Sequence, residues 1–177
     1  NYPTKIIFEN NYIVNLNSFT YDRKKFIITS ASPTSLKDKL GNEFNVDEFI
    51  FQIDKNLLKS KSLKYKDYEN NKVSLENAII NFNDNSILGK DLEINFYNSL
   101  SGIMKNEPRL KSRSAMIDNK STKLKKAVYT TCKKSEKCPA WQIQAEEILH
   151  DKEIKRINYK NAWLKFYDKP VVYFPKF

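Results

Sequence analysis

The sequence contains little glycine, histidine or cysteine, and each shortage excludes a kind of site. Its three glycines are Gly41, Gly89 and Gly102, so the phosphate-binding loop and the dinucleotide-binding motif, which need clustered glycines, are absent. The single histidine, His150, excludes histidine-rich metal sites, and two cysteines cannot complete a four-cysteine zinc site. The Gly-x-Ser-x-Gly turn of serine hydrolases is absent too. We therefore expect no catalytic site, no metal and no cofactor, and do not predict an enzyme.

Long hydrophobic runs and a secretion signal are also missing. No apolar run approaches the length of a transmembrane helix. The sequence starts with no basic segment followed by an apolar one, so any signal was removed or lies upstream. Of the 177 residues, 40% are hydrophobic and 13% aromatic, which argues against disorder. We predict one domain spanning residues 1–177.

The dominant pattern along the chain has a period of two, which is typical of half-buried strands. Short stretches rich in Asn and Asp separate the alternating segments, and these side chains can replace glycine in turns. Helix is weakly supported, with residues 145–149 as the best candidate. The pattern predicts an all-β fold. The clearest alternating segments are residues 25–30, 49–54, 63–66, 72–76, 92–97 and 156–160.

A faint internal repeat refines this prediction. Residues 73–82 (Val-x-Leu-x-x-Ala-x-Ile-x-Phe) match residues 157–166 (Ile-x-Tyr-x-x-Ala-x-Leu-x-Phe), and residues 122–127 form a weaker third copy. The alternation slips by one residue just before each alanine, which indicates a bulge or a strand bent around a corner. We predict an open β-jellyroll built from stacked, bent antiparallel strand pairs. Chance recurrence is the alternative.

The phase of the alternation assigns an apolar inward face. Polar residues such as Asn81 and Lys165 must face water, and Ile79 and Trp163 fall in the same outward phase. The predicted inward residues are Phe51, Ile53, Leu63, Tyr65, Val73, Leu75, Ile80, Phe82, Ile94, Phe96, Ile143, Ile157, Leu164 and Phe166.

The chain is basic, with 31 Lys and Arg against 21 Asp and Glu and a net charge of +10. The excess is either a solvated strand face with lysines protecting the edges, or a surface for an anionic partner. A basic all-β module that binds nucleic acid is therefore one alternative function, although no nucleic-acid-binding motif is present. A carbohydrate-binding jellyroll is another. His150-Asp151 suits a base and its orienting carboxylate, but such a pair more often forms a polar turn.

The two cysteines, Cys132 and Cys138, enclose the polar segment Lys-Lys-Ser-Glu-Lys. Neighbouring lysines favour the thiolate and its oxidation, so a disulfide is expected in an oxidising compartment. Two free thiols in a surface loop are the alternative. The partner of each sulfur cannot be deduced from the spacing.

Five segments resemble a known family when taken in order. They are Ala127-Val-Tyr-Thr-Thr-Cys132, Cys138-Pro-Ala-Trp141-Gln-Ile-Gln-Ala145, Ile148-Leu-His150-Asp151, Tyr159-x-Asn161-Ala162 and Pro170-Val-Val-Tyr-Phe-Pro175. Together they resemble the lipopolysaccharide-assembly outer-membrane proteins, the LptD or organic solvent tolerance family. The resemblance covers the last third of the chain strongly. The first two thirds resemble the family's OstA-type repeats more weakly, including Gly89-Lys-Asp91.

The resemblance implies a periplasmic N-terminal domain on the inner side of the cell outer membrane. In that family the domain is an open β-jellyroll whose interior receives the acyl chains of lipopolysaccharide. It docks onto a periplasmic LptA-like bridge protein and feeds a C-terminal β-barrel that holds an LptE-like plug lipoprotein. The inward residues would then line a lipid groove, with no nucleic-acid partner, and the abrupt end of the chain would precede the barrel.

The resemblance also bears on the cysteines. In the best-known members, a cysteine at the position of Cys132 pairs with one at the far end of the barrel. Here Cys138 follows only six positions later, so it either forms a local bridge with Cys132 or shares the partners in the barrel.

Overall fold

The computed structural model describes residues 4–7, 13–16, 18–37, 43–66, 70–97, 107–135 and 139–176, with side chains from residue 18 onward. Within this part of the chain, fourteen strands form one antiparallel sheet, and the only helical element is a short 3-10 turn at Ile53–Lys55. The predicted all-β class is confirmed. The strands are β1 (Thr4–Ile7), β2 (Ile13–Leu16), β3 (Thr20–Asp22), β4 (Ile27–Ser30), β5 (Thr34–Lys37), β6 (Glu43–Gln52), β7 (Leu57–Lys66), β8 (Lys72–Asn81), β9 (Ser86–Asn95), β10 (Arg109–Ile117), β11 (Ser121–Thr130), β12 (Trp141–Asp151), β13 (Arg156–Phe166) and β14 (Lys169–Lys176).

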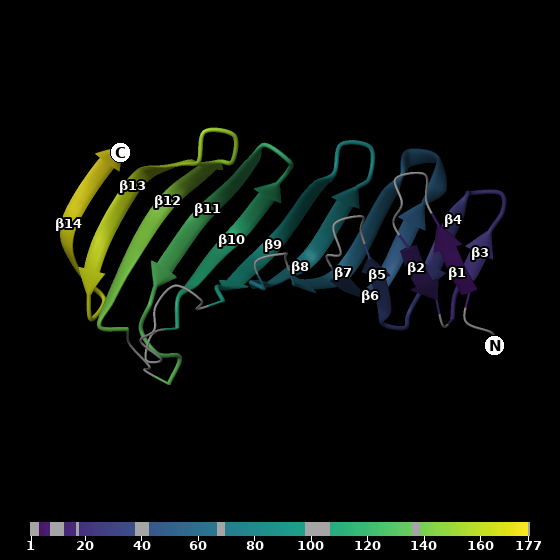
Figure 1. Ribbon diagram of the computed structural model, residues 1–177, viewed down its shortest axis with the longest axis horizontal. Helices are drawn as coiled ribbons and strands as arrows, with labels where there is room; N and C mark the ends of the chain where they lie inside the picture. The colour runs from purple at the N-terminus through teal and green to yellow at the C-terminus, as the bar shows by residue number, and fades with distance from the viewer. Residues whose placement is uncertain are drawn as a thin grey trace.

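The sheet is long and open. From β5 onward each strand pairs with the next in the sequence, and β1 and β14 lie at opposite ends (Figure 1). At the β1 end the order is β1-β2-β5-β6, while β4 pairs with both β3 and β6. Most pairing is therefore between sequence neighbours, as predicted for stacked hairpins.

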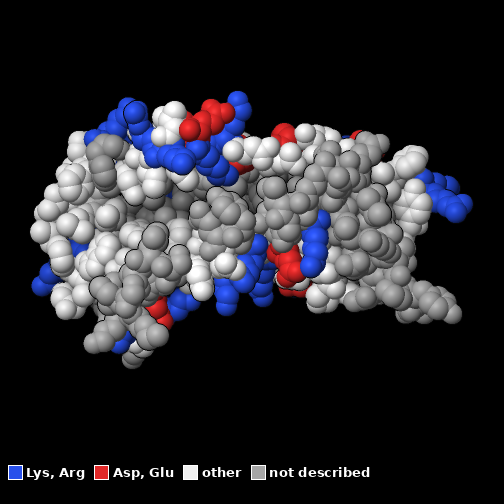
Figure 2. Space-filling view, in the orientation of Figure 1, with Lys and Arg blue, Asp and Glu red and all other residues white. Residues whose placement is uncertain are grey.

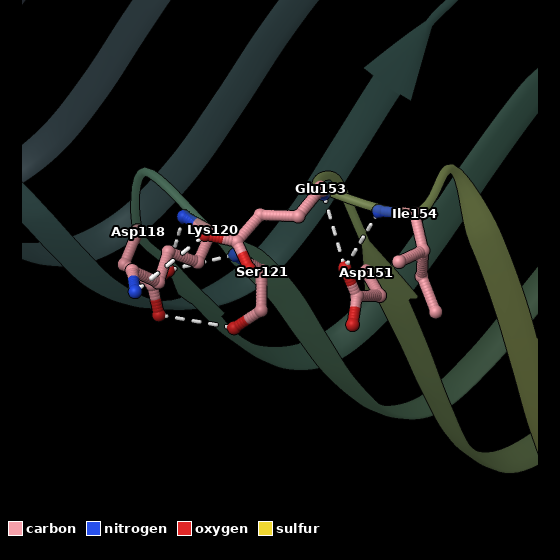
Figure 3. Close-up of polar contacts among 6 residues, drawn as sticks. All are labelled: Asp118, Lys120, Ser121, Asp151, Glu153 and Ile154. Carbon is pink, nitrogen blue, oxygen red and sulfur yellow. Dashed lines mark hydrogen bonds and ion pairs between the residues drawn. The ribbon is translucent and has the colours of Figure 1, made fainter.

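Aspartate and asparagine side chains stabilise the hairpin turns, as their positions in the sequence predict. Asp118 Oδ1 accepts hydrogen bonds from the N–H groups of Lys120 and Ser121, both at 2.7 Å (Figure 3). Asp151 Oδ1 does the same for Glu153 at 3.0 Å and Ile154 at 3.2 Å. These bonds satisfy turn donors without glycine. Residues 9–11 and 41–42, which also contain Asn between alternating segments, lie outside the described residues.

The helix considered for residues 145–149 is wrong. These residues lie in β12, where Ala145 pairs with Ala127 of β11 and Ala162 of β13. A five-residue stretch is too short to hold a helix by itself, so pairing with strands on both sides decides its conformation.

A residue with positive φ interrupts the middle of most long strands. Because these residues and those opposite them on the intervening strands turn the sheet, we call the set the bend line. The prediction of a corner just before Ala78, Ala127 and Ala162 is confirmed. The positive-φ members are Glu48, Asn77, Asp91, Lys126 and Asn161, with φ between 47° and 52°, and the opposite members are Lys61, Arg113 and Glu146.

The bend line divides the sheet into two walls. Alternation slips at the bend, so the buried residues of both halves face the same side, which we call the inner face. In β8, Val73 and Leu75 are buried before the bend, and Ala78 and Ile80 are buried after it. Wall A contains β4 and residues 49–60, 78–90, 114–125 and 147–160; wall B contains β5 and residues 43–47, 62–66, 72–76, 92–95, 109–112, 127–130, 141–145 and 162–166.

The β1 end makes the same corner by a different route. β4 pairs with Phe49–Gln52 and β5 with Glu43–Val46, on the two halves of the bent strand β6. The connection at residues 31–33 therefore takes the place that a positive-φ residue has in the longer strands. Pro33 suits this connection because a proline has no N–H to donate to a neighbouring strand. The two walls and their shared hydrophobic core thus extend from β4 to β13.

Candidate functional site

The inner face of wall B carries one apolar side chain on each successive strand. Neighbours in this row are Cα partners across each strand pair, so the apolar surface is continuous from β5 to β14. Such a row is the feature expected of a surface that shields apolar groups from water. Its members are Leu36, Phe44, Tyr65, Val73, Ile94, Leu110, Tyr129, Ile143, Leu164 and Val172.

A second row follows the inner face of wall A. It is apolar up to β10, continues with the polar Thr122 and His150, and ends at Ile157. The inner face therefore contains two facing apolar rows along most of its length, and wall A becomes more polar near β12. The members are Ile28, Phe51, Leu58, Ile80, Ile87, Ile117, Thr122, His150 and Ile157.

Exposure of these rows rises towards the β14 end. Leu36 is 2% exposed and Val172 is 39% exposed, at the two ends of the wall B row. In the wall A row Ile28 is 7% exposed and Ile157 is 47% exposed. The walls therefore close on their own side chains from β4 to β11, whereas the inner face is open to solvent at β13 and β14.

The inward residues predicted from the sequence all lie on or beside this inner face, but they differ in exposure. Their contact with lipid remains a prediction. Phe51, Leu63, Val73, Leu75, Ile80 and Phe82 are buried; Ile53, Tyr65, Ile94, Ile143 and Leu164 are half-buried; Phe96, Ile157 and Phe166 are exposed. Ile79 and Trp163 lie on the outer face, in the same phase as Asn81 and Lys165.

Several residues of the inner face were absent from the sequence-based set. They follow the same alternation, so extending that pattern to every strand would have included them. Val46, Leu92, Leu110, Leu124 and Ile148 are examples, and each is buried in the shared core.

Two tyrosines, one on β11 and one on β13, bring hydroxyl groups to the interior. Burial raises the pKa of Tyr129, on wall B, above its ordinary value of 10.0. Burial also raises the pKa of Tyr159, on wall A, and the proximity of Tyr129 adds to the rise. Tyr129 also stacks edge-on against Phe96 and Trp141, with ring centroids 6.2 Å and 6.1 Å apart.

Basic side chains gather at the rim of wall A. Figure 2 shows Lys and Arg at the top of the view, over the turns that join β10 to β11 and β12 to β13. Lys152 ties the two turns together, because its N–H donates to the Lys120 carbonyl at 2.8 Å and its Nζ donates to the Asp118 carbonyl. Burial lowers the pKa of Lys152, and the charge of Asp118 opposes that shift.

The carboxylate beside His150 is engaged in this rim. Asp151 accepts the two turn hydrogen bonds described above, while His150 is half-buried on the inner face. This geometry matches the polar-turn alternative for the His150-Asp151 pair.

The segment around Cys132 is held by several contacts. The Cys132 N–H donates to Thr130 Oγ1 at 3.2 Å, its Sγ lies 3.7 Å from the Trp141 carbonyl oxygen, and Arg109 donates to the Cys132 carbonyl. Cys138 lies outside the described residues, so its pairing with Cys132 stays a prediction.

No protein-family model and no curated protein matches this chain. Within the described residues, no helix is long and apolar enough to span a bilayer. The same residues contain no group of three or more His, Cys, Asp or Glu side chains placed to hold a metal ion. The resemblance to the lipopolysaccharide-assembly family therefore remains a hypothesis, and the geometry of the inner face carries the functional argument.

Proposed function

We propose that this domain takes part in lipopolysaccharide transport, with acyl chains lying against the inner face between the two walls. The observation that carries the proposal is the continuous wall B row, which is buried at Leu36 and 39% exposed at Val172. A partly open apolar trough suits an amphiphile, because each buried CH₂ contributes about 0.8 kcal/mol.

The distribution of burial supports a location for the chains. Val46 and Leu63 are completely buried and Leu92 is 1% exposed, so these inner side chains between β6 and β9 offer no surface to an external ligand. At β13 and β14 the inner side chains Phe166, Val172 and Phe174 are 36–45% exposed. We assign the acyl chains to this end. For a chain to enter the closed interior between β4 and β11, the two walls would have to separate.

The family resemblance supports the remaining parts of the proposal. It leads us to propose an LptA-like bridge protein and a β-barrel with an LptE-like plug as partners, at the periplasmic side of the outer membrane. An edge such as β14 is suited to strand addition because its outer backbone groups have no partner strand among the described residues. Strand addition at this edge would join the apolar inner face of the domain to the apolar face of its partner.

The two tryptophans offer a matched test. Trp141 is half-buried beside Tyr129 on the inner face, and Trp163 is 39% exposed on the outer face. Trp163→Phe leaves only the inner reporter, and Trp141→Phe leaves only the outer one. Added lipopolysaccharide should shift the fluorescence of Trp141 to shorter wavelength and leave that of Trp163 unchanged. An unchanged Trp141 spectrum at saturating lipopolysaccharide would contradict the proposal.

A further inference from the structure

The outer face of wall A carries an apolar row that neither the core nor the proposed groove uses. Ile50, Leu88 and Met116 are 43–45% exposed, and Ile79 and Leu149 are half-buried. Lys59 and Lys123 complete the row. Successive members are Cα partners, in the order Ile50, Lys59, Ile79, Leu88, Met116, Lys123, Leu149.

The corresponding row on the outer face of wall B is polar, which makes it an internal reference. Both rows cross the same seven strands, β6 to β12. The wall B row contains one aliphatic residue, Val128, in the order Asn45, Lys64, Ser74, Glu93, Lys111, Val128, Gln144. An outer strand position thus has no general need for an aliphatic side chain, and five aliphatic residues in one row, with Ile79, Leu88 and Met116 as direct neighbours, mark an interaction surface.

A lysine-rich row lies beside the aliphatic row, closer to the bend line. Glu147 is the only acid among its members, and Glu76 of β8 is the Cα partner of Lys90 at its end. No ion pair within the described residues involves any of its lysines or Lys59 and Lys123, so these charges are available to an external anion. The row runs Lys90, Ser114, Lys125, Glu147, Lys160, Lys176.

The chemistry of the two rows favours lipid over protein. Protein interfaces are enriched in aromatic residues, methionine and arginine and depleted in lysine, whereas these rows contain six lysines, a single methionine and no aromatic residue or arginine. Aliphatic side chains that enter the acyl boundary, flanked by lysines that reach the phosphates, are the pattern of an interfacial membrane surface. We propose that the outer face of wall A lies on an anionic bilayer surface.

Vesicle co-sedimentation tests this assignment. The whole chain should bind vesicles of phosphatidylcholine with phosphatidylglycerol, bind phosphatidylcholine alone much more weakly, and dissociate as salt is raised. Each lysine near an anionic surface strengthens binding about five-fold. The double variant Lys59→Gln/Lys123→Gln should therefore bind about 25-fold more weakly, and Leu88→Ser/Met116→Ser should also weaken binding several-fold.

The matched control changes the same charge on the other wall. Lys64→Gln/Lys72→Gln alters two exposed lysines of wall B and should weaken binding far less than the wall A pair. All altered positions are exposed, so circular dichroism and the melting temperature should stay unchanged. Absence of binding to anionic vesicles would overturn the proposal and favour a protein occupant. An equal loss in the wall B control would overturn the assignment to wall A.

Discussion

The side chain of Leu75 occupies the space that a β-carbon on residue 89 would need. A Cβ added to Gly89 would lie 2.5 Å from Leu75 Cδ2 and 3.0 Å from Leu75 Cβ. Leu75 belongs to wall B and Gly89 to wall A, so this contact is a point where the two walls close against each other. Glycine is required here by the close approach of the walls.

Replacing Gly89 with alanine should destabilise the fold by about 1–3 kcal/mol, because the core would be overpacked at this contact. Leu75→Ala alone should cost about 2–5 kcal/mol through the cavity it leaves. Urea unfolding of both single variants and the double variant gives the coupling. We expect Gly89→Ala to be nearly neutral when Leu75 is alanine, and additive costs would show that the two walls do not meet at this point.

The bend line predicts that one substitution destabilises the fold at one position of β11 and is close to neutral at another. Lys126 has φ 52°, a conformation that β-branched residues strongly disfavour, whereas Lys123 lies in the extended part of the same strand. Lys126→Val should cost about 1–2 kcal/mol, and Lys123→Val should be close to neutral. Chemical denaturation measures both. Equal effects of the two changes would mean that the corner does not depend on residue 126.

Asp118 predicts a dependence of stability on pH. Burial raises the pKa of Asp118, but hydrogen bonds from Ser121 and Lys120 outweigh that effect and hold the pKa below its ordinary value of 3.8. The ionised carboxylate therefore contributes stability above pH 3.8, and this contribution is lost as the pH falls through the folded-state pKa. Asp118→Ala should cost about 1 kcal/mol at neutral pH, and less in acid.

The matched control for Asp118→Ala is Asn119→Ala, an exposed neighbour in the same turn. Its effect should be small and independent of pH. Thermal unfolding across the acid range compares the two variants. A deficit of Asp118→Ala that stays constant down to the lowest pH would exclude the charged form as the source of stability.

Cys132 and Cys138 are predicted to form a disulfide in this chain when it is made in an oxidising compartment. Closing so short a loop removes little chain entropy, so reduction should lower stability only modestly. Intact mass without reductant should be lower by two hydrogen atoms, and neither sulfur should react with an alkylating reagent. Two alkylated thiols in freshly purified material from that compartment would refute the pairing.

The repeat explains how much of this fold could be predicted from the sequence. Asn77-Ala78 and Asn161-Ala162 both form corners, and the alternation around them identifies the inner face. These features depend on local phase and on a small residue at the corner, so both are visible in a single strand.

Exposure could not be predicted in the same way. Phe82 and Phe166 hold equivalent places in the repeat, yet Phe82 is 4% exposed and Phe166 is 45% exposed. Phe82 packs edge-on against Phe51 at 5.9 Å, in the interior of the stack, whereas Phe166 lies next to the last strand. Position in the stack, which local pattern does not encode, decides the difference. Ile80→Asp, at a position that is 6% exposed, should therefore unfold the domain.

Photo-crosslinking tests the central claim, that acyl chains of lipopolysaccharide lie on the open part of the inner face. A benzophenone amino acid at Phe166 faces this surface, and the same group at the adjacent Lys165 faces outward. In the presence of lipopolysaccharide, residue 166 should form an adduct and residue 165 should not. A reporter at Phe82, in the closed core, should capture little. Equal capture at 165 and 166, or no adduct at 166 in a folded variant, would contradict the account.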